Sequence, residues 1–247
     1  MCCRPASPTI LVPMRERRLT ATIARLSSAA LDLALPASCA GCGLEGRSLC
    51  ASCVTDLDVR LSRPPGVPIG LPSPAPAPLL QLEWCAPYSG AVRRAIHALK
   101  YRGERRLAEP FGGAVARRWR AAGVGGDVLV PVPADAERVR ARGYDQARLI
   151  AAVAARQLNL PAADLVVRTR ATVAQFDLDR TARFGNLGDA FAADPTAAGL
   201  AAATLRRAWI ILVDDVVTTG ATLAGCAAAL LDAGALGVSA ITVARER

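Results

Sequence analysis

The 247-residue sequence lacks any charge-free, proline-free run of about 20 apolar residues, the length that a membrane-spanning helix needs. Its hydrophobic fraction of 52% is largely alanine, so we expect no membrane insertion. Aromatic residues make up only 4% of the chain. They are too few to supply the stacking platforms typical of proteins that read RNA sequence. The single histidine, His97, lies beside Ile96 and Leu99 on a predicted helix, where packing is a commoner role than catalysis.

A convincing export signal is also absent. Basic residues and an apolar stretch do precede Cys39 in the manner of a lipoprotein signal. However, Asp32 interrupts the apolar stretch, and Pro36 is poorly placed for cleavage. We therefore expect a cytoplasmic protein whose thiols stay reduced.

Negative charge is scarce relative to positive charge. The chain has 30 Lys and Arg against 21 Asp and Glu, a formal net charge of +9. This excess is compatible with anionic partners such as nucleotides, pyrophosphate or nucleic acid, and does not choose among them. Because the excess is mainly arginine in an alanine-rich chain, a GC-rich coding background can also account for it.

The most informative segment begins with aliphatic residues, which predict a strand over Arg207–Val213 that is buried on both faces. Asp214 and Asp215 follow, then a Thr-Thr-Gly loop and an alanine-rich helix predicted over Leu223–Ala233. The free N–H groups at a helix start attract phosphate. Paired carboxylates can accept hydrogen bonds from vicinal sugar hydroxyls or help to hold Mg²⁺. The segment therefore predicts a sugar-phosphate site.

The loop residues fit the same interpretation. Thr218, Thr219 and Thr222 add hydroxyl donors, and Gly220 allows close approach of the backbone to a ligand. Asp or Thr at such a junction is also common as a helix N-cap. One cap explains one residue, but it does not explain two adjacent carboxylates whose repulsion needs a ligand, a cation or a base to offset it.

Two cysteine pairs, Cys39-x-x-Cys42 and Cys50-x-x-Cys53, lie close together in the chain. Four thiolates at this spacing can hold tetrahedral Zn²⁺, and the role would be structural because so short a segment hardly folds without metal. Two disulfides or an iron–sulfur cluster are the alternatives. The missing export signal argues against disulfides, and the spacing does not match a ferredoxin run.

The remaining pattern divides the chain into four parts. We expect a disordered tail over residues 1–15, a helix over Glu16–Leu35 with the cysteine module over residues 16–60, and a proline-rich linker over residues 61–82. Seven prolines lie between Arg63 and Pro78. Residues 83–247 alternate between helical and strand patterns. Such α/β alternation predicts a parallel sheet flanked by helices, with ligands beyond the carboxyl ends of the strands.

The helices and strands expected in that α/β domain follow from periodicity. Helices are predicted at Gly90–Tyr101, Arg105–Ala121 and Tyr144–Gln157, and further strands at Asp127–Val132, Leu165–Val167 and Val238–Ala244. Cys85 and Cys226 fall within these patterns and are expected to be buried small residues rather than nucleophiles.

Basic residues gather beside several predicted strand or helix ends. Arg138, Arg140 and Arg142 follow a Pro-Val-Pro segment, and Arg168 and its successors follow another strand. A transferase that releases pyrophosphate needs such groups near the leaving group. For a single arginine a solvated surface role is more common. Arg142 is the exception, because it lies between a strand end and a helix start.

Taken together, these segments resemble known families. The segment from Ile210 to Leu223 resembles the phosphoribosyl-pyrophosphate (PRPP) motif of type I phosphoribosyltransferases. In that family the acidic pair contacts the ribose hydroxyls and the following loop holds the 5′-phosphate. The matching loop residues here are Val216, Val217, Thr218, Thr219, Gly220, Ala221 and Thr222. From about Leu31 onward, the cysteine pairs, Leu-Lys-Tyr-x-Gly, Pro-Val-Pro, Arg-Gly-Tyr-x-Gln-Ala and the PRPP motif together resemble the ComF/GntX family.

That resemblance implies a type I phosphoribosyltransferase-like fold with an N-terminal zinc module, in a cytoplasmic bacterial protein linked in some members to natural competence. It also implies that Arg168–Arg180 is a mobile loop that closes over PRPP. Two positions depart from the family pattern. Asp145 replaces the usual Asn, and Gly188-Asp189-Ala190 replaces the usual approach to Phe191. The first adds negative charge near the expected pyrophosphate contacts.

Two functions therefore compete. The first is Mg²⁺-dependent phosphoribosyl transfer from PRPP to an unknown acceptor, with Asp214, Asp215 and Arg142 as catalytic residues. The second is a non-catalytic adaptor that senses PRPP or a nucleotide, or that serves DNA uptake through single-stranded DNA or the uptake machinery. A likeness of fold alone does not separate them.

Overall fold

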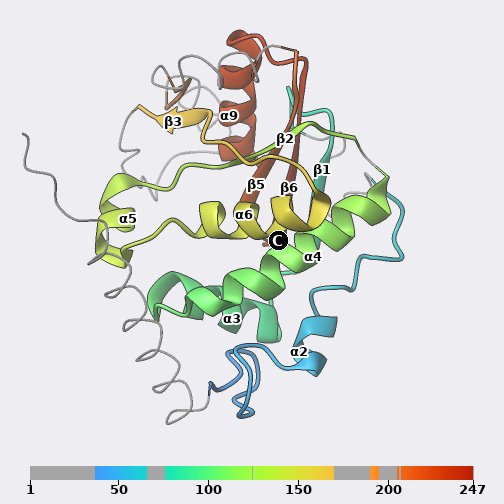
Figure 1. The fold of residues 1–247 in the computed structure, drawn as a ribbon, viewed down its shortest axis with the longest axis vertical. Coiled ribbons are helices and arrows are strands. Elements are labelled where there is room, and N and C mark those ends of the chain that lie inside the picture. The colour runs from blue at the N-terminus through green and yellow to red at the C-terminus, as the bar shows by residue number, and fades with distance from the viewer. Residues whose placement is uncertain are drawn as a thin grey trace, which may run out of the picture.

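A computed structural model describes residues 37–65, 76–123, 125–169, 190–194, 205 and 207–246 (Figure 1). The expected tail over residues 1–15, the expected helix over Glu16–Leu35 and most of the expected loop over Arg168–Arg180 lie outside these residues. No helix in the described part of the chain is long and apolar enough to cross a membrane.

The centre of the fold is a sheet of four parallel strands in the order β1-β6-β5-β2. Their bounds are β1 Leu82–Pro87, β2 Val128–Pro131, β5 Trp209–Val217 and β6 Gly237–Arg245. The predicted parallel sheet is therefore confirmed. Strand β1 is an addition, because Glu83 and Pro87 interrupt its apolar pattern. Glu83 is nonetheless fully buried, since the guanidinium of Arg118 donates to its carboxylate.

Both faces of the sheet are covered, as the aliphatic strand pattern predicts. Ile210 and Leu212 of β5 pack into a cluster with helix α9 (Ala221–Asp232), whereas Ile211 and Val213 pack into a second cluster with helices α4 (Ala108–Ala122) and α6 (Gln146–Leu158). Figure 1 shows α4 and α6 crossing in front of the strands and α9 standing apart from them. The alternation of side chains along a strand produces this division.

Three boundaries near the expected site differ from the sequence prediction. Strand β5 continues through the acidic pair to Val217, because Asp214–Val217 pair with Thr242–Arg245 of β6. Helix α9 begins at Ala221, two residues before the expected start. Helix α5 (Ala136–Arg142) replaces an expected basic loop, and its N-cap Asp135 accepts hydrogen bonds from the backbone N–H groups of Glu137 and Arg138.

The other expected helices form close to their predicted bounds. Helix α3 spans Gly90–Tyr101 as predicted, and the expected helix from Arg105 divides into a short 3-10 helix at Arg105–Leu107 and α4. A small antiparallel pair, β3 (Val166–Arg168) with β4 (Phe191–Ala193), contacts α9. Strand β4 was not expected, because three residues are too short for a periodicity signal.

The cysteine segment packs against the α/β domain through helix α2 (Ala51–Thr55) and its flanking loops. Arg94 on α3 donates from Nε to the carbonyl oxygen of Gly41 at 2.6 Å. Cys39, Cys53 and Leu57 belong to the same buried cluster as α3, α4 and α6. The described part of the module is therefore continuous with the core of the domain.

Candidate functional site

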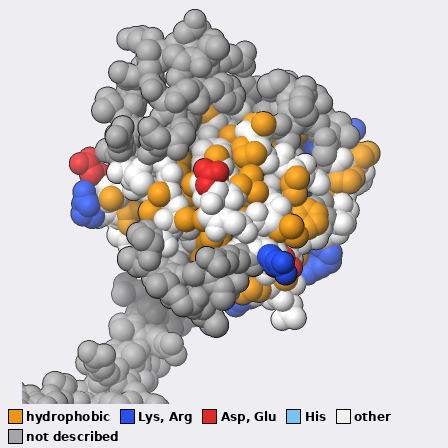
Figure 2. All heavy atoms as spheres, turned by 90° about the horizontal axis from the view of Figure 1, so that it is seen from above, with side chains coloured by type: hydrophobic (Ala, Val, Ile, Leu, Met, Phe, Trp, Pro, Cys, Tyr) orange, Lys and Arg blue, Asp and Glu red, His pale blue; other side chains and the backbone are white. Residues whose placement is uncertain are grey.

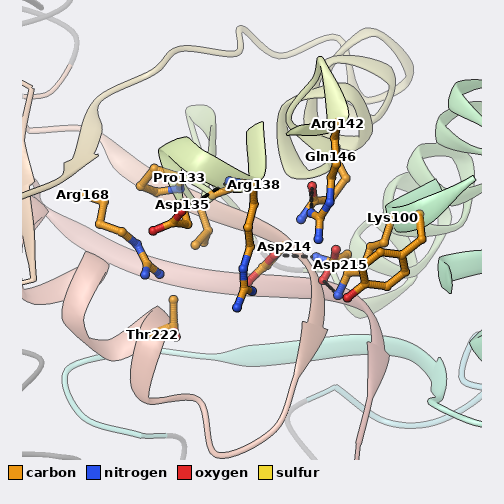
Figure 3. A pocket seen from close by; sticks show the side chains of 13 residues that line it. Lys100, Pro133, Asp135, Arg138, Arg142, Gln146, Arg168, Asp214, Asp215 and Thr222 are labelled. Carbon is orange, nitrogen blue, oxygen red and sulfur yellow. Dashed lines mark hydrogen bonds and ion pairs between the residues drawn. The ribbon is translucent and has the colours of Figure 1, made fainter. Parts of the chain in front are cut away.

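A cavity of about 340 Å³ lies at the carboxyl ends of β2 and β5, where ligands bind in open α/β sheets. Segments far apart in the sequence contribute to it, as Figure 3 shows. They are the end of α3, the loop after β2, helices α5 and α6, β3, β5 and the start of α9. The lining residues are Lys100, Tyr101, Val132, Pro133, Ala134, Asp135, Arg138, Arg142, Gln146, Arg168, Asp214, Asp215 and Thr222.

The acidic pair lies in the cavity wall. Because side chains alternate along a strand, Asp214 follows Leu212 toward α9, and Asp215 follows Val213 toward α3 and α6. Asp214 Oδ1 accepts a hydrogen bond of 2.7 Å from the backbone N–H of Asp215. The side chain of Asp215 is almost entirely buried, and its Oδ1 lies 2.9 Å from the ammonium nitrogen of Lys100.

The two carboxylates have unequal surroundings. Burial and the neighbouring charge of Asp215 raise the pKa of Asp214 well above its usual value. Burial alone would lower the pKa of Lys100, but the charges of Asp215 and Asp214 outweigh it and raise that pKa. The site therefore holds a stable Lys100–Asp215 ion pair beside a second carboxyl group that ionises reluctantly.

Three arginines surround this pair. Arg142, singled out from the sequence, lines the cavity and donates from Nη1 to Gln146 Oε1 at 2.9 Å. Arg138 extends from α5 toward Asp214 in Figure 3, and Arg168 lies on the far side of Asp214 from Lys100. Sequence reasoning assigned neither of these two a site role of its own. With Lys100, the lining holds four cations and three carboxylates, which suits an anionic ligand that also carries hydroxyl groups.

The Thr-Gly loop is divided by the structure. Thr222 lines the cavity, whereas Val216, Val217, Thr218, Thr219, Gly220 and Ala221 are not among its lining residues. The side chains of Val216 and Val217 pack against the core, so a ligand can reach these two residues only through their backbone.

Gly220 occupies the N-cap position of α9 with φ of +80°, a conformation that favours glycine. No side chain makes a cap hydrogen bond there. The closest hydroxyl contact, from the backbone N–H of Ala221 to Thr219 Oγ1, is long at 3.4 Å. An ordinary N-cap role therefore does not account for the acidic pair, and this helix start suits an anion.

Asp145 has a structural role that the sequence did not reveal. Its Oδ1 accepts from the backbone N–H of Arg148 at the start of α6, and its Oδ2 accepts from the backbone N–H of Ala134 at 3.1 Å. The carboxylate thus caps a helix and fixes the loop after β2. It is not among the cavity-lining residues, so the departure from Asn does not put a charge in the cavity wall.

Several lining residues were missed by sequence reasoning, above all Lys100, Asp135 and Gln146. The signal for Lys100 was present in the Leu-Lys-Tyr-x-Gly segment, and that for Gln146 in Arg-Gly-Tyr-x-Gln-Ala, but neither pattern says what its polar residue contacts. His97 is exposed, and its ring lies 4.5 Å from that of Tyr101. The polar residues that follow Arg168 in the sequence lie outside the described residues: Arg170, Thr172, Gln175, Arg180, Arg183 and Asn186.

The four cysteines form a second cluster. The sulfur atoms of Cys39, Cys42, Cys50 and Cys53 all lie within 4.8 Å of one another. The Cys42 and Cys50 sulfurs are 3.6 Å apart, too far for a disulfide. Zn–S bonds of about 2.3 Å place the sulfurs of a tetrahedral site roughly 3.8 Å apart. The cluster therefore has the ligand set and spacing of a metal site.

The environment of Cys39 also suits a thiolate. Burial opposes its ionisation, but hydrogen bonds from the backbone of Cys50, Cys42 and Gly41 prevail and lower its pKa to about 6. Cys85 and Cys226 are buried instead, and burial raises the pKa of both thiols. As expected, these two are core residues rather than nucleophiles.

Comparison with known proteins gives relatives over most of the chain. No protein-family model matches it. The DNA utilization protein YhgH of Salmonella typhi is 29% identical over 222 residues, which cover 82% of this chain and 94% of the relative. The DNA utilization protein YhgH of Escherichia coli K12 is 32% identical over 179 residues, which cover 70% of this chain and 75% of the relative.

Two solved structures overlap more weakly. One is the glutamine PRPP amidotransferase from B. subtilis complexed with ADP and GMP, with a TM-score of 0.36 and 20% identity. The other, an allosteric regulatory enzyme of purine biosynthesis, has a TM-score of 0.36 and 18% identity. They cover 54% and 55% of this chain, which spans 25% and 26% of theirs. Overlaps this slight carry no argument about activity.

Proposed function

This chain belongs to the family of the DNA utilization protein YhgH, and we propose that it binds PRPP with Mg²⁺ in the cavity beyond β5 as a phosphoribosyltransferase-like protein of the ComF type. One observation carries the proposal. Paired carboxylates, several cations and a helix start without a side-chain cap border a single cavity at the carboxyl end of a parallel sheet. A sugar that carries both hydroxyls and phosphates matches these three features together.

Each group has a role in the proposed reaction. Asp214 and Asp215 accept hydrogen bonds from the ribose hydroxyls, and Thr218–Thr222 with the start of α9 hold the 5′-phosphate. The bond from C1 of the ribose to pyrophosphate breaks with its electron pair on the leaving group, and the lone pair of an acceptor forms the new bond to C1. Arg138 and Arg142 stabilise the departing charge. Mg²⁺ bound with the substrate neutralises part of the pyrophosphate charge.

Titration calorimetry with PRPP and Mg²⁺ tests binding. Asp214→Asn and Asp215→Asn should each weaken the affinity for PRPP by roughly 10- to 100-fold, since each change removes a carboxylate acceptor for a ribose hydroxyl. Asp232→Asn, at the exposed end of α9, is the matched control and should bind as the wild type does. Equal affinity in all variants would overturn the proposed site. Pyrophosphate release from PRPP across nucleobases and amines then tests turnover and searches for the acceptor.

The cysteine cluster is proposed to hold one structural Zn²⁺ through Cys39, Cys42, Cys50 and Cys53. Its sulfur spacing supports a closed four-cysteine site. A cytoplasmic location agrees with these reduced thiols. Metal analysis of the purified protein should give about one zinc per chain, and a markedly lower content would refute the assignment.

A nucleic-acid adaptor is the second candidate, and a basic groove favours it. A groove of about 370 Å³ runs between the cysteine module and α3, lined by Ala40, Gly90, Arg93, Arg94, His97 and Arg102. Positive charge is not spread evenly, because the described part of the face in Figure 2 shows mostly hydrophobic and uncharged side chains. The relatives' name, DNA utilization protein, points the same way.

Salt dependence separates this candidate from the first. Single-stranded DNA that neutralises its phosphates in the groove should lose affinity with a log–log slope of about −0.7 per contact. Arg93→Gln with Arg102→Gln should flatten that slope, whereas Arg120→Gln on α4 should not. Strong salt-sensitive DNA binding without pyrophosphate release would favour the adaptor.

A further inference from the structure

The Lys100–Asp215 ion pair is the contact that the proposed reaction leaves unexplained. Lys100 is mostly buried, with 20% of its side chain exposed, and Asp215 has 5% exposed. Only one carboxylate oxygen of Asp215 is engaged. Oδ1 lies 2.9 Å from Lys100 Nζ, whereas Oδ2 is buried and has no hydrogen-bond partner among the residues that the structure describes. A buried acceptor without a partner is unfavourable, so such an atom in a cavity wall indicates a place for a ligand donor.

The position of Lys100 is itself fixed by packing. It lies in the last turn of α3, directly after Leu99, which is fully buried. The hydroxyl of Tyr144 donates a hydrogen bond to the backbone carbonyl of Leu99. Arg105 Nη2 donates to the backbone carbonyl of Gly143, which ties the same two segments together. The Leu-Lys-Tyr-x-Gly and Arg-Gly-Tyr-x-Gln-Ala segments therefore meet here and hold the end of α3 beside β5.

We propose that Lys100 is a positioning residue of the sugar site, whose ammonium group holds Oδ1 of Asp215 so that Oδ2 is presented to a ribose hydroxyl without a metal ion at this carboxylate. The inference rests on the proposed sugar-phosphate function. It assigns charge compensation at Asp215 to Lys100 and leaves Mg²⁺ to the pyrophosphate. The raised pKa of Lys100 agrees with a permanent cation at this position.

The same geometry sets a specificity. If Oδ2 of Asp215 accepts its hydrogen bond from one hydroxyl group of the ligand, it stays unpaired when the ligand lacks that hydroxyl. Ribose 5-phosphate should therefore bind more tightly than the analogue that lacks the hydroxyl group bound by Oδ2. That analogue is 2-deoxyribose 5-phosphate if Oδ2 accepts from the 2-hydroxyl, and the 3-deoxy analogue if it accepts from the 3-hydroxyl. The difference expected for one hydrogen bond to a charged group is on the order of 10- to 100-fold.

The test uses ribose 5-phosphate, which has no pyrophosphate, and the full-length protein by calorimetry. Wild-type affinity should be the same in EDTA and in Mg²⁺. Lys100→Met should lower it by on the order of 10- to 100-fold and erase the preference over the deoxy analogue, because the carboxylate is no longer held. Lys100→Arg should restore most of both. Arg120→Met, at an exposed position in the last turn of α4 and outside the cavity lining, is the control and should change neither.

The outcomes separate the two proposals. If the wild type binds neither PRPP nor ribose 5-phosphate, the proposed function fails. If the wild type binds PRPP but Lys100→Met keeps the affinity and the sugar preference, the role of Lys100 is overturned while the function stands. Loss of ribose 5-phosphate affinity in EDTA would overturn the metal-free carboxylate. Circular dichroism of Lys100→Met and Lys100→Arg establishes that both variants fold.

Discussion

The cysteine cluster and the cavity at the carboxyl ends of β2 and β5 are built in opposite ways. All four thiols of the cluster come from one short segment, Cys39–Cys53, and their mutual distances follow from local turns. The cavity takes its lining from α3, the loop after β2, α5, α6, β3, β5 and α9. A local site can be read from spacing alone, whereas an assembled site depends on which distant segments the core brings together.

The two sites also differ in how they offset charge. Four thiolates in the cluster would require a metal ion to compensate their charge. The cavity instead compensates Asp215 internally with Lys100 and leaves Asp214 with a raised pKa. The cavity is thus prepared for a ligand before one binds.

Removing a cysteine should have the largest effect. Cys53→Ser should lower the zinc content from about one per chain to near zero. The melting temperature should fall by about 10 °C or more, because Cys53 also belongs to the main buried cluster. Metal analysis and thermal melting measure both effects. Cys226 is a buried cysteine on α9, outside the cluster, so the Cys226→Ala protein should keep its full zinc content. Full zinc content in Cys53→Ser would contradict a four-cysteine site.

Arg118 joins the end of the cysteine module to strand β1 of the sheet and should have the next largest effect. Its guanidinium donates to buried Glu83 of β1 and to the backbone carbonyls of Arg60 and Arg63, just after the module. Arg118→Met removes the closest cation from buried Glu83 and leaves it the Arg60 guanidinium at 3.6 Å and the Gln81 amide, which should destabilise the protein by about 3 kcal/mol in urea unfolding. Arg120→Met on the same helix should stay within about 0.5 kcal/mol. A comparable loss of unfolding free energy in both variants would mean that the buried Arg118–Glu83 pair does not stabilise the contact between the module and the sheet.

Substitution of Asp214 should show that this carboxyl group in the cavity wall lowers the stability of the folded protein. Its folded pKa lies well above the unfolded value of 3.8, so the folded state holds the proton more tightly. The resulting destabilisation is complete above the folded pKa and is relieved as the pH falls toward 3.8. Asp214→Asn should therefore be more stable than wild type at pH 8. The gain should shrink in acid, as urea unfolding across pH would show. A stability difference between Asp214→Asn and wild type that is constant across pH, or reversed in sign, would argue against a raised pKa at Asp214.

Asp145 should give the smallest effect. Asn keeps an acceptor for the start of α6, so Asp145→Asn should cost less than about 0.5 kcal/mol, whereas Asp145→Ala should cost about 1 kcal/mol through the lost cap. Because Asp145 is not in the cavity wall, PRPP affinity should hardly change in the Asn variant. A large gain in PRPP affinity would instead indicate that its charge opposes the pyrophosphate.

Much of the fold was predictable because its signals are local. The aliphatic alternation of β5, the helical periodicity of α3 and the paired CxxC spacing each depend on neighbours in the chain. Strand β1 escaped prediction because buried Glu83 breaks the apolar pattern, and its burial is tolerable only through distant partners such as Arg60 and Arg118, 23 and 35 residues away in the chain. Helix α5 escaped because its arginines resemble a solvated loop, although Asp135 and Gly143 stand at its N-cap and C-cap positions.

The sequence by itself determined the chemistry that is available: two adjacent carboxylates at a strand end, a Thr-Gly turn before a helix, and four thiols at metal-binding spacing. The tertiary structure alone decided how those groups are used. It placed Lys100 on Asp215, gave Asp145 to a helix cap, and brought Arg138 and Arg168 to the cavity beside Arg142. The reason is physical, because pairings across 38 to 115 residues of chain, such as Arg105 with Gly143 or Lys100 with Asp215, are set by core packing, which no short stretch of sequence encodes.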